Sequence, residues 1–281
     1  MPKTFLLGVG AHKGGTTWLH DYLKGRPDTD MGFLKEYHVF DALFIDEAVI
    51  RRKFLQQRIK DIVSPTRWPR LDQLRLLRFL GNPEHYFDYF QRLCRDPRVK
   101  LTGDITPSYS GLPIEAFGYI KQQLEQRGFD VKVLLLMRDP VERCLSATRM
   151  WMRHSRIERT AESEAARLAV FHQLPGYRLR TRYDLTIANL EAVFRPEQIF
   201  YGFYEELFDQ ASVRALCRFL GLPYLEPDLA KRVNESRTDH VLPDALRAEV
   251  AQAYAMVYRA VGERFGQARV AALWPNQRFV R

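Results

Sequence analysis

The segment from residue 5 to residue 25 constrains the fold of this chain more than any other. It reads FLLGVGAHKGGTTWLHDYLKG, which is an apolar run, a basic turn with two adjacent glycines, and an amphipathic stretch headed by Thr16 and Thr17. An apolar run, a glycine turn and then helical periodicity predict a buried strand, a tight loop and a helix. The rest of the fold has to accommodate this unit.

The loop of this unit has the chemistry of an anion site. Gly14 and Gly15 can adopt positive φ and let the backbone approach a ligand, and the first N–H groups of the following helix lack intrahelical partners. Together with the helix dipole and the Lys13 ammonium, these donors suit a phosphate or a sulfate. The order of residues fits neither common nucleotide motif. Lys13 precedes the glycine pair, unlike a Walker lysine, and it stands where GxGxxG requires its third glycine.

Length and composition set the class of protein. A chain of 281 residues without repeats or linkers is expected to form a single domain over residues 1–281. The net charge of +9 favours anionic ligands, although a solvated arginine-rich surface would give the same charge. Three widely spaced cysteines indicate neither a disulfide framework nor a zinc site. Without a signal peptide or an apolar run near the roughly 20 residues of a membrane span, we expect a cytoplasmic protein with no membrane span.

The remaining pattern alternates strands with helices. Strands are predicted at 101–109, 131–139 and 199–203, and helices at about 113–126, from Pro140 onward, and at 160–172, 183–194, 211–220 and 244–265. This alternation predicts an α/β fold with a P-loop-like parallel sheet flanked by helices. Residues 46–96 are rich in arginine and helical in pattern. We interpret them as a solvated helical insertion, with a patch for an acidic acceptor as the alternative.

A second candidate anion site follows the strand at 131–139. Arg138 stands at the carboxyl end of that strand, and Ser146 falls about two turns into the next helix. If the two strands are neighbours in a parallel sheet, Arg138 and Ser146 share one crevice with Lys13. A nucleotide with phosphates at both ends would fit such a crevice. Taken alone, Arg138 would more often form a structural ion pair with Asp139 or Glu142.

Five segments together carry a resemblance to a known family. They lie between residues 12 and 222 and read HKGGTTWLHDYL, KEYHVFD, GDITPSY, VKVLLLMRDPVERCLSATRMW and QIFYGFYEELFDQASVRALCRFLGL. In this order they resemble the sulfotransferases that use 3′-phosphoadenosine 5′-phosphosulfate (PAPS), particularly the branch of the heparan sulfate enzymes. The resemblance implies PAPS as sulfuryl donor and adenosine 3′,5′-bisphosphate (PAP) as product, with no metal. Since no membrane stem is seen, a soluble, bacterial-type member is expected.

The resemblance also implies roles for individual residues. Arg138 and Ser146 would hold the 3′-phosphate, and Tyr177 lies about where the family contacts the nucleotide. Residues 234–237 are a second candidate for that contact. Lys13 would also stabilise charge on the oxygen that leaves sulfur. The group that would hold the 5′-phosphosulfate comprises Lys13, Gly14, Gly15, Thr16 and Thr17, with Trp18 beginning the helix.

The proton of the acceptor needs a base, because a hydroxyl is a poor nucleophile at neutral pH. Glu36 stands where the heparan-type enzymes have a catalytic carboxylate, and His38 follows at the family's spacing. Either could serve as the base. The alternatives are a surface carboxylate paired with Lys35 and a structural histidine. We expect direct in-line displacement at sulfur.

The acceptor is less constrained than the donor. Where the heparan-type motif has a lysine, this chain has Ile105, which argues against a heparan-like acceptor. A glycan or a small molecule, sulfated on oxygen or nitrogen, is expected, and no nucleic acid. Tyr37, Phe40, Trp68 and Tyr109 are candidate pocket aromatics. The sequence does not indicate an oligomeric state. Two other readings stay open: a P-loop kinase-like nucleotide enzyme and a non-catalytic anion-binding module.

Overall fold

A parallel sheet forms the centre of the molecule. The computed structural model describes residues 2–45, 71–229 and 241–280. Within these ranges the chain forms a five-stranded sheet of order β2-β3-β1-β4-β5, and every neighbouring pair is parallel. The strands are β1 Lys3–Gly10, β2 Thr29–Asp30, β3 Leu101–Ile105, β4 Phe129–Met137 and β5 Ile199–Phe203. The predicted α/β fold is confirmed.

The two central strands are buried on both faces. Along β1, Phe5 and Leu7 face one hydrophobic cluster, whereas Leu6 faces the other. On β4, Val133 belongs to the first cluster and Leu134 to the second. Because side chains alternate across a strand, both faces of the sheet need a cover of helices, which explains the continuous apolar runs.

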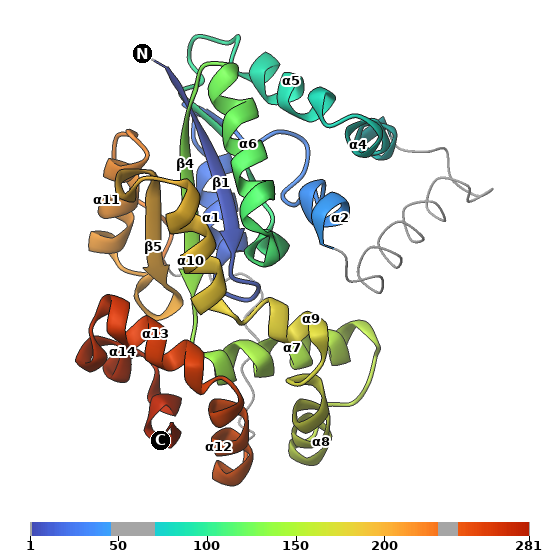
Figure 1. Cartoon of the computed structure of the whole chain (residues 1–281), viewed down its shortest axis with the longest axis vertical. Coiled ribbons are helices and arrows are strands. Elements are labelled where there is room, and N and C mark those ends of the chain that lie inside the picture. The colour runs from blue at the N-terminus through green and yellow to red at the C-terminus, as the bar shows by residue number, and fades with distance from the viewer. Residues whose placement is uncertain (1, 46–70, 230–240, 281) are drawn as a thin grey trace, which may run out of the picture.

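Helices from distant parts of the chain provide that cover (Figure 1). α1 Thr16–Lys24 and α11 Gln210–Phe219 contribute to the cluster around Leu6. α6 Ile114–Gln126, α10 Tyr183–Val193 and α13 Ala255–Phe265 contribute to the cluster around Phe5. The other helices are α2 Phe40–Phe44, α4 Leu71–Gly81, α5 Glu84–Leu93, α7 Pro140–His154, α8 Ala161–Phe171, α9 Pro175–Leu179, α12 Asp244–Ala253 and α14 Gln267–Leu273.

Several predicted elements differ in the structure. The helix expected over 244–265 is two helices, because Tyr254 leaves the helical conformation at φ −114° and ψ 20°. The short elements β2, α2 and α9 were not predicted. In the arginine-rich insertion, α4 and α5 are helical as expected, while residues 46–70 lie outside the described residues. No helix in the described ranges combines the length and apolar character needed to cross a bilayer.

Candidate active site

The loop between β1 and α1 is shaped by close contact with its neighbours. A Cβ on Gly14 would lie 2.4 Å from the carbonyl oxygen of Leu136 on β4, so only glycine fits there. Gly15 has φ 89° and is the N-cap of α1. The other positive φ belongs to Lys13, at 70°, and not to Gly14 as predicted. Gly14 is therefore needed for the close approach of two backbone segments.

The N-terminus of α1 is available to a ligand. No side chain caps its first turn, and its N-cap, Gly15, cannot supply one. Gly15, Thr16, Thr17 and Trp18 line a cavity of about 260 Å³. Free helix N–H groups beside a cavity suit an anion, as the sequence indicated.

The cavity collects most of the predicted site residues. Its remaining lining comes from the segments that follow β1, β2, β3, β4 and β5, and from α7. It comprises His12, Lys13, Lys35, Glu36, Pro107, Arg138, Ser146, Met150, Arg153, His154, Tyr204 and Phe208. The crevice predicted between the Lys13 loop and the Arg138/Ser146 segment is therefore present, because β1 and β4 are neighbours.

Three predicted residues do not line this cavity. Gly14 packs against β4. His38 does not reach the cavity itself, but its Nε2 contacts the carboxylate of Glu36, which does. Tyr177 is on α9, where its hydroxyl lies 3.4 Å from Thr148 Oγ1. Residues 234–237, the other candidate nucleotide contact, lie outside the described residues.

The Lys13 ammonium is partly buried and lies near other cations. Burial lowers the pKa of its ammonium to about 8, and the nearby cations Arg153, Arg138 and Lys35 reinforce the shift. Its Nζ contacts Met150 Sδ at 3.8 Å. A bound anion would relieve the repulsion among these cations, so their grouping favours the binding of an anion.

Arg138 is held in the site by the Lys13 loop. Its Nη1 donates a hydrogen bond to the carbonyl oxygen of Lys13 at 3.2 Å. Its guanidinium lies over the ring of Tyr204, 4.2 Å from the centroid. These contacts fix the position of the guanidinium without neutralising its charge.

The acidic neighbours of Arg138 have other partners. Asp139 caps α7 by accepting hydrogen bonds from the N–H groups of Val141 and Glu142. Glu142 pairs with Arg247 at 2.9 Å. Among the described residues, the alternative considered for Arg138, a structural ion pair with Asp139 or Glu142, does not form.

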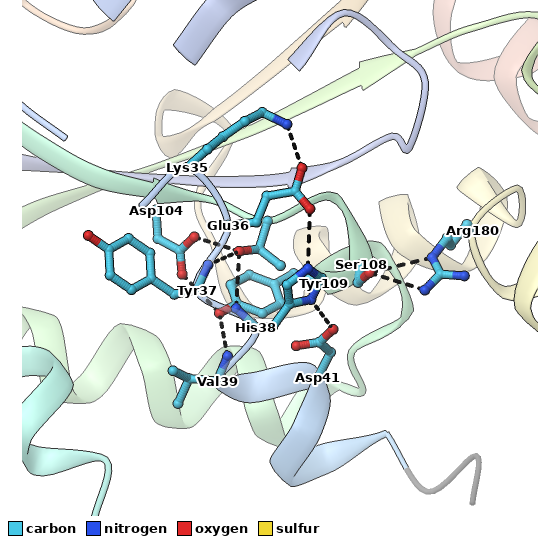
Figure 2. Close-up of polar contacts among 11 residues, drawn as sticks. Lys35, Glu36, Tyr37, His38, Val39, Asp41, Asp104, Ser108, Tyr109 and Arg180 are labelled. Carbon is cyan, nitrogen blue, oxygen red and sulfur yellow. Dashed lines mark hydrogen bonds and ion pairs between the residues drawn. The ribbon is translucent and has the colours of Figure 1, made fainter. Parts of the chain in front are cut away.

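Glu36 belongs to a chain of charged hydrogen bonds (Figure 2). Its Oε1 pairs with Lys35 Nζ at 2.5 Å, and its Oε2 lies 3.2 Å from His38 Nε2. His38 Nδ1 lies 2.8 Å from Asp41 Oδ2. Burial opposes both charges, but the charged partners outweigh it. His38 and Lys35 lower the pKa of Glu36 to about 2, and Asp41 and Glu36 raise the pKa of His38 to about 9. At neutral pH the carboxylate is therefore ionised and the imidazole is protonated.

A buried carboxyl fixes the segment that carries Glu36. Asp104 accepts hydrogen bonds from Tyr86 Oη and Tyr109 Oη, both at 2.9 Å, and from Thr106 Oγ1 at 2.6 Å. Thr106 Oγ1 in turn accepts the backbone N–H of Tyr37 at 2.9 Å. Burial raises the pKa of Asp104 to about 6. Asp104 and Thr106 therefore position the residues around Glu36.

Three of the four candidate pocket aromatics are core residues. Tyr37, Phe40 and Tyr109 are fully buried in the cluster around Phe5, so they do not line an acceptor pocket. Trp68 lies outside the described residues.

Several lining residues have no role that was predicted from the sequence. Arg153 stands seven residues after Ser146 on α7, and Met150 stands four after it, so the three share one helix face. That spacing could have revealed Arg153. Nothing in the pattern singled out His12.

In residues 2–45, 71–229 and 241–280, no three histidine, cysteine, aspartate or glutamate side chains are grouped to hold a metal ion.

Comparisons with known proteins identify the family and the fold. A search of curated proteins found no match. A solved sulfotransferase from Alicyclobacillus acidocaldarius shares the fold, with a TM-score of 0.58 and 21% sequence identity. The alignment covers 96% of this chain and 100% of that protein's chain. A sulfotransferase domain from the Synechococcus PCC 7002 olefin synthase is 18% identical with a TM-score of 0.48, over 91% of this chain and 94% of that domain. The model of the sulfotransferase family matches residues 6–227. The chain belongs to the sulfotransferase family.

Proposed function

We propose that this protein transfers the sulfuryl group of PAPS to a hydroxyl or an amine of a carbohydrate or a small metabolite. One observation carries the proposal. A single cavity brings the uncapped N-terminus of α1 and Lys13 together with Arg138 and Ser146 from the neighbouring strand and helix. These groups suit a nucleotide with a 5′-phosphosulfate and a 3′-phosphate. When bound, PAPS supplies a sulfuryl group attached to a phosphate leaving group.

Lys13 and the N–H groups of α1 would hold the 5′ end. Negative charge grows on the phosphate oxygen as it leaves sulfur, and a fixed ammonium stabilises that charge more than it stabilises the ground state. Arg138 and Ser146 would hold the 3′-phosphate. A guanidinium pre-positioned by the Lys13 carbonyl and Tyr204 loses little freedom on binding.

Glu36 is the better candidate for the base. With a pKa raised to about 9, His38 already carries its second proton at neutral pH and cannot accept another. Glu36 is ionised and lines the cavity. A carboxylate with a pKa near 2 is a weak base, so proton transfer from the acceptor would accompany formation of the bond to sulfur. His38 and Asp41 then hold Glu36 in place.

The acceptor side differs from the heparan-type pattern. Ile105 is fully buried on β3, where its side chain packs against Gly8. Position 105 therefore contributes no contact to an acceptor.

The experiment that tests the proposal is incubation of the protein with ³⁵S-labelled PAPS and an extract of the native cell. We expect labelled product with the wild-type protein and none with Lys13→Ala. Labelled product formed equally by both proteins would contradict the role of the loop.

Binding measurements separate the two alternatives. A kinase-like enzyme would bind ATP at least as tightly as PAP, whereas the proposal expects tight binding of PAP alone. A non-catalytic anion-binding module would lose affinity steeply with salt and would be indifferent to Lys13→Ala.

A further inference from the structure

His12 lines the cavity but has no role in the mechanism described above. It precedes Lys13 in the loop after β1, and its side chain shares the cavity with Lys13, Glu36 and Arg138. A neutral polar side chain among charged groups at a transfer site is a candidate ligand contact.

The two ring nitrogens of His12 have different surroundings. Nδ1 is buried and has no hydrogen-bond partner in the described part of the chain. Nε2 also has no hydrogen-bond partner there, but unlike Nδ1 it is not buried. Since His12 lines the cavity, Nε2 is the ring nitrogen that is open to it. A proton on Nδ1 would leave a buried donor unsatisfied, whereas a proton on Nε2 can bond to water or to a ligand. The favoured tautomer therefore points an N–H into the cavity.

The imidazole of His12 is also uncharged. Burial lowers its pKa well below the ordinary value, and the cations Arg180, Arg143 and Lys13 lower it further, against a weaker opposing effect of Glu36. At neutral pH the ring is one donor and one acceptor, and it adds no further charge to the cavity.

The place of His12 indicates which part of a ligand it meets. His12 precedes Lys13 in the chain and lines the same cavity as Glu36, so the imidazole lies between the phosphate side and the base side of that cavity. In the proposed transfer, the group between the leaving phosphate oxygen and the acceptor oxygen is the sulfuryl group. We propose, on the basis of the proposed function, that His12 Nε2–H donates a hydrogen bond to a sulfuryl oxygen of PAPS and orients that group for transfer.

The test compares two nucleotides that differ by the sulfuryl group. PAPS carries it and PAP does not, so calorimetric titration of each without acceptor isolates the contact. The variants are His12→Leu, which removes the donor, and His12→Gln, whose carboxamide restores a neutral N–H at a similar reach. His154→Leu removes an exposed imidazole of the same cavity and serves as the matched comparison.

We expect His12→Leu to bind PAPS about 10- to 150-fold more weakly than the wild type, the usual range for one hydrogen bond to an anionic group, and to bind PAP unchanged. His12→Gln should recover most of the lost PAPS affinity, and His154→Leu should leave the ratio of the two affinities unaltered. Equal weakening of PAPS and PAP by His12→Leu, or unchanged PAPS binding, overturns the inference. A wild-type protein that binds neither nucleotide overturns the proposed function itself, and the inference with it.

Discussion

The pH dependence of donor capture tests the state of Lys13. The ammonium has a pKa of about 8 because it is buried among Arg153, Arg138 and Lys35. Only the protonated form attracts the 5′-phosphosulfate, and kcat/KM for PAPS reports the ionisation of the free enzyme. Raising the pH through 8 removes the charge, so kcat/KM should fall about tenfold between pH 7 and pH 9. At saturating PAPS the profile should be flatter, since the bound anion stabilises the ammonium.

The control is Lys13→Arg, which keeps its charge across this range because a guanidinium does not titrate below about pH 12. His38 loses its proton near pH 9 in both proteins, so it affects both profiles alike. The 3′-phosphate of PAPS is fully ionised well below pH 8, with a second pKa near 6. The assay is steady-state sulfuryl transfer at limiting PAPS from pH 6.5 to 9.5. A flat wild-type profile, or the same fall in Lys13→Arg, would refute the reasoning.

Two further substitutions probe the base and the loop. Glu36→Gln should lower kcat by about 10²- to 10⁴-fold, the usual effect of losing a general base, while calorimetry shows PAP affinity unchanged; full activity would remove Glu36 from that role. Gly14→Ala should destabilise the protein by about 1–3 kcal/mol in urea unfolding, because its Cβ would lie 2.4 Å from the Leu136 carbonyl oxygen. The matched control is Gly118→Ala on α6, where the new Cβ meets nothing within 4 Å, and it should stabilise the helix by about 0.5–1 kcal/mol. Equal stability of the two alanine variants would contradict the packing of Gly14.

Local signals in the sequence account for the part of the site that was predicted. β1, the glycine loop and the start of α1 are contiguous, and so are β4, Arg138 and the segment to Ser146. Once the strands are parallel neighbours, the two segments must meet at the same edge of the sheet. The shared cavity follows from those facts.

The parts that could not be predicted depend on contacts between distant segments. Asp104 binds Tyr86, which is 18 residues away, and this buried network makes both residues structural. The break at Tyr254 accompanies a hydrogen bond from its hydroxyl to the carbonyl oxygen of His172 at 2.5 Å, a partner that helical periodicity cannot reveal. The positive φ at Lys13 likewise reflects how the loop sits against β4.

The most direct test of the central claim is a calorimetric cycle with two nucleotides and two proteins. In the proposed site, Arg138 binds the 3′-phosphate and the Lys13 loop binds the 5′ end. Arg138→Ala should therefore weaken PAP by about 10- to 150-fold, the range for a charged hydrogen bond, and leave the binding of 5′-AMP, which has no 3′-phosphate, unchanged. An equal loss of affinity for PAP and 5′-AMP would show that Arg138 only supports the loop through the Lys13 carbonyl, and would contradict the account.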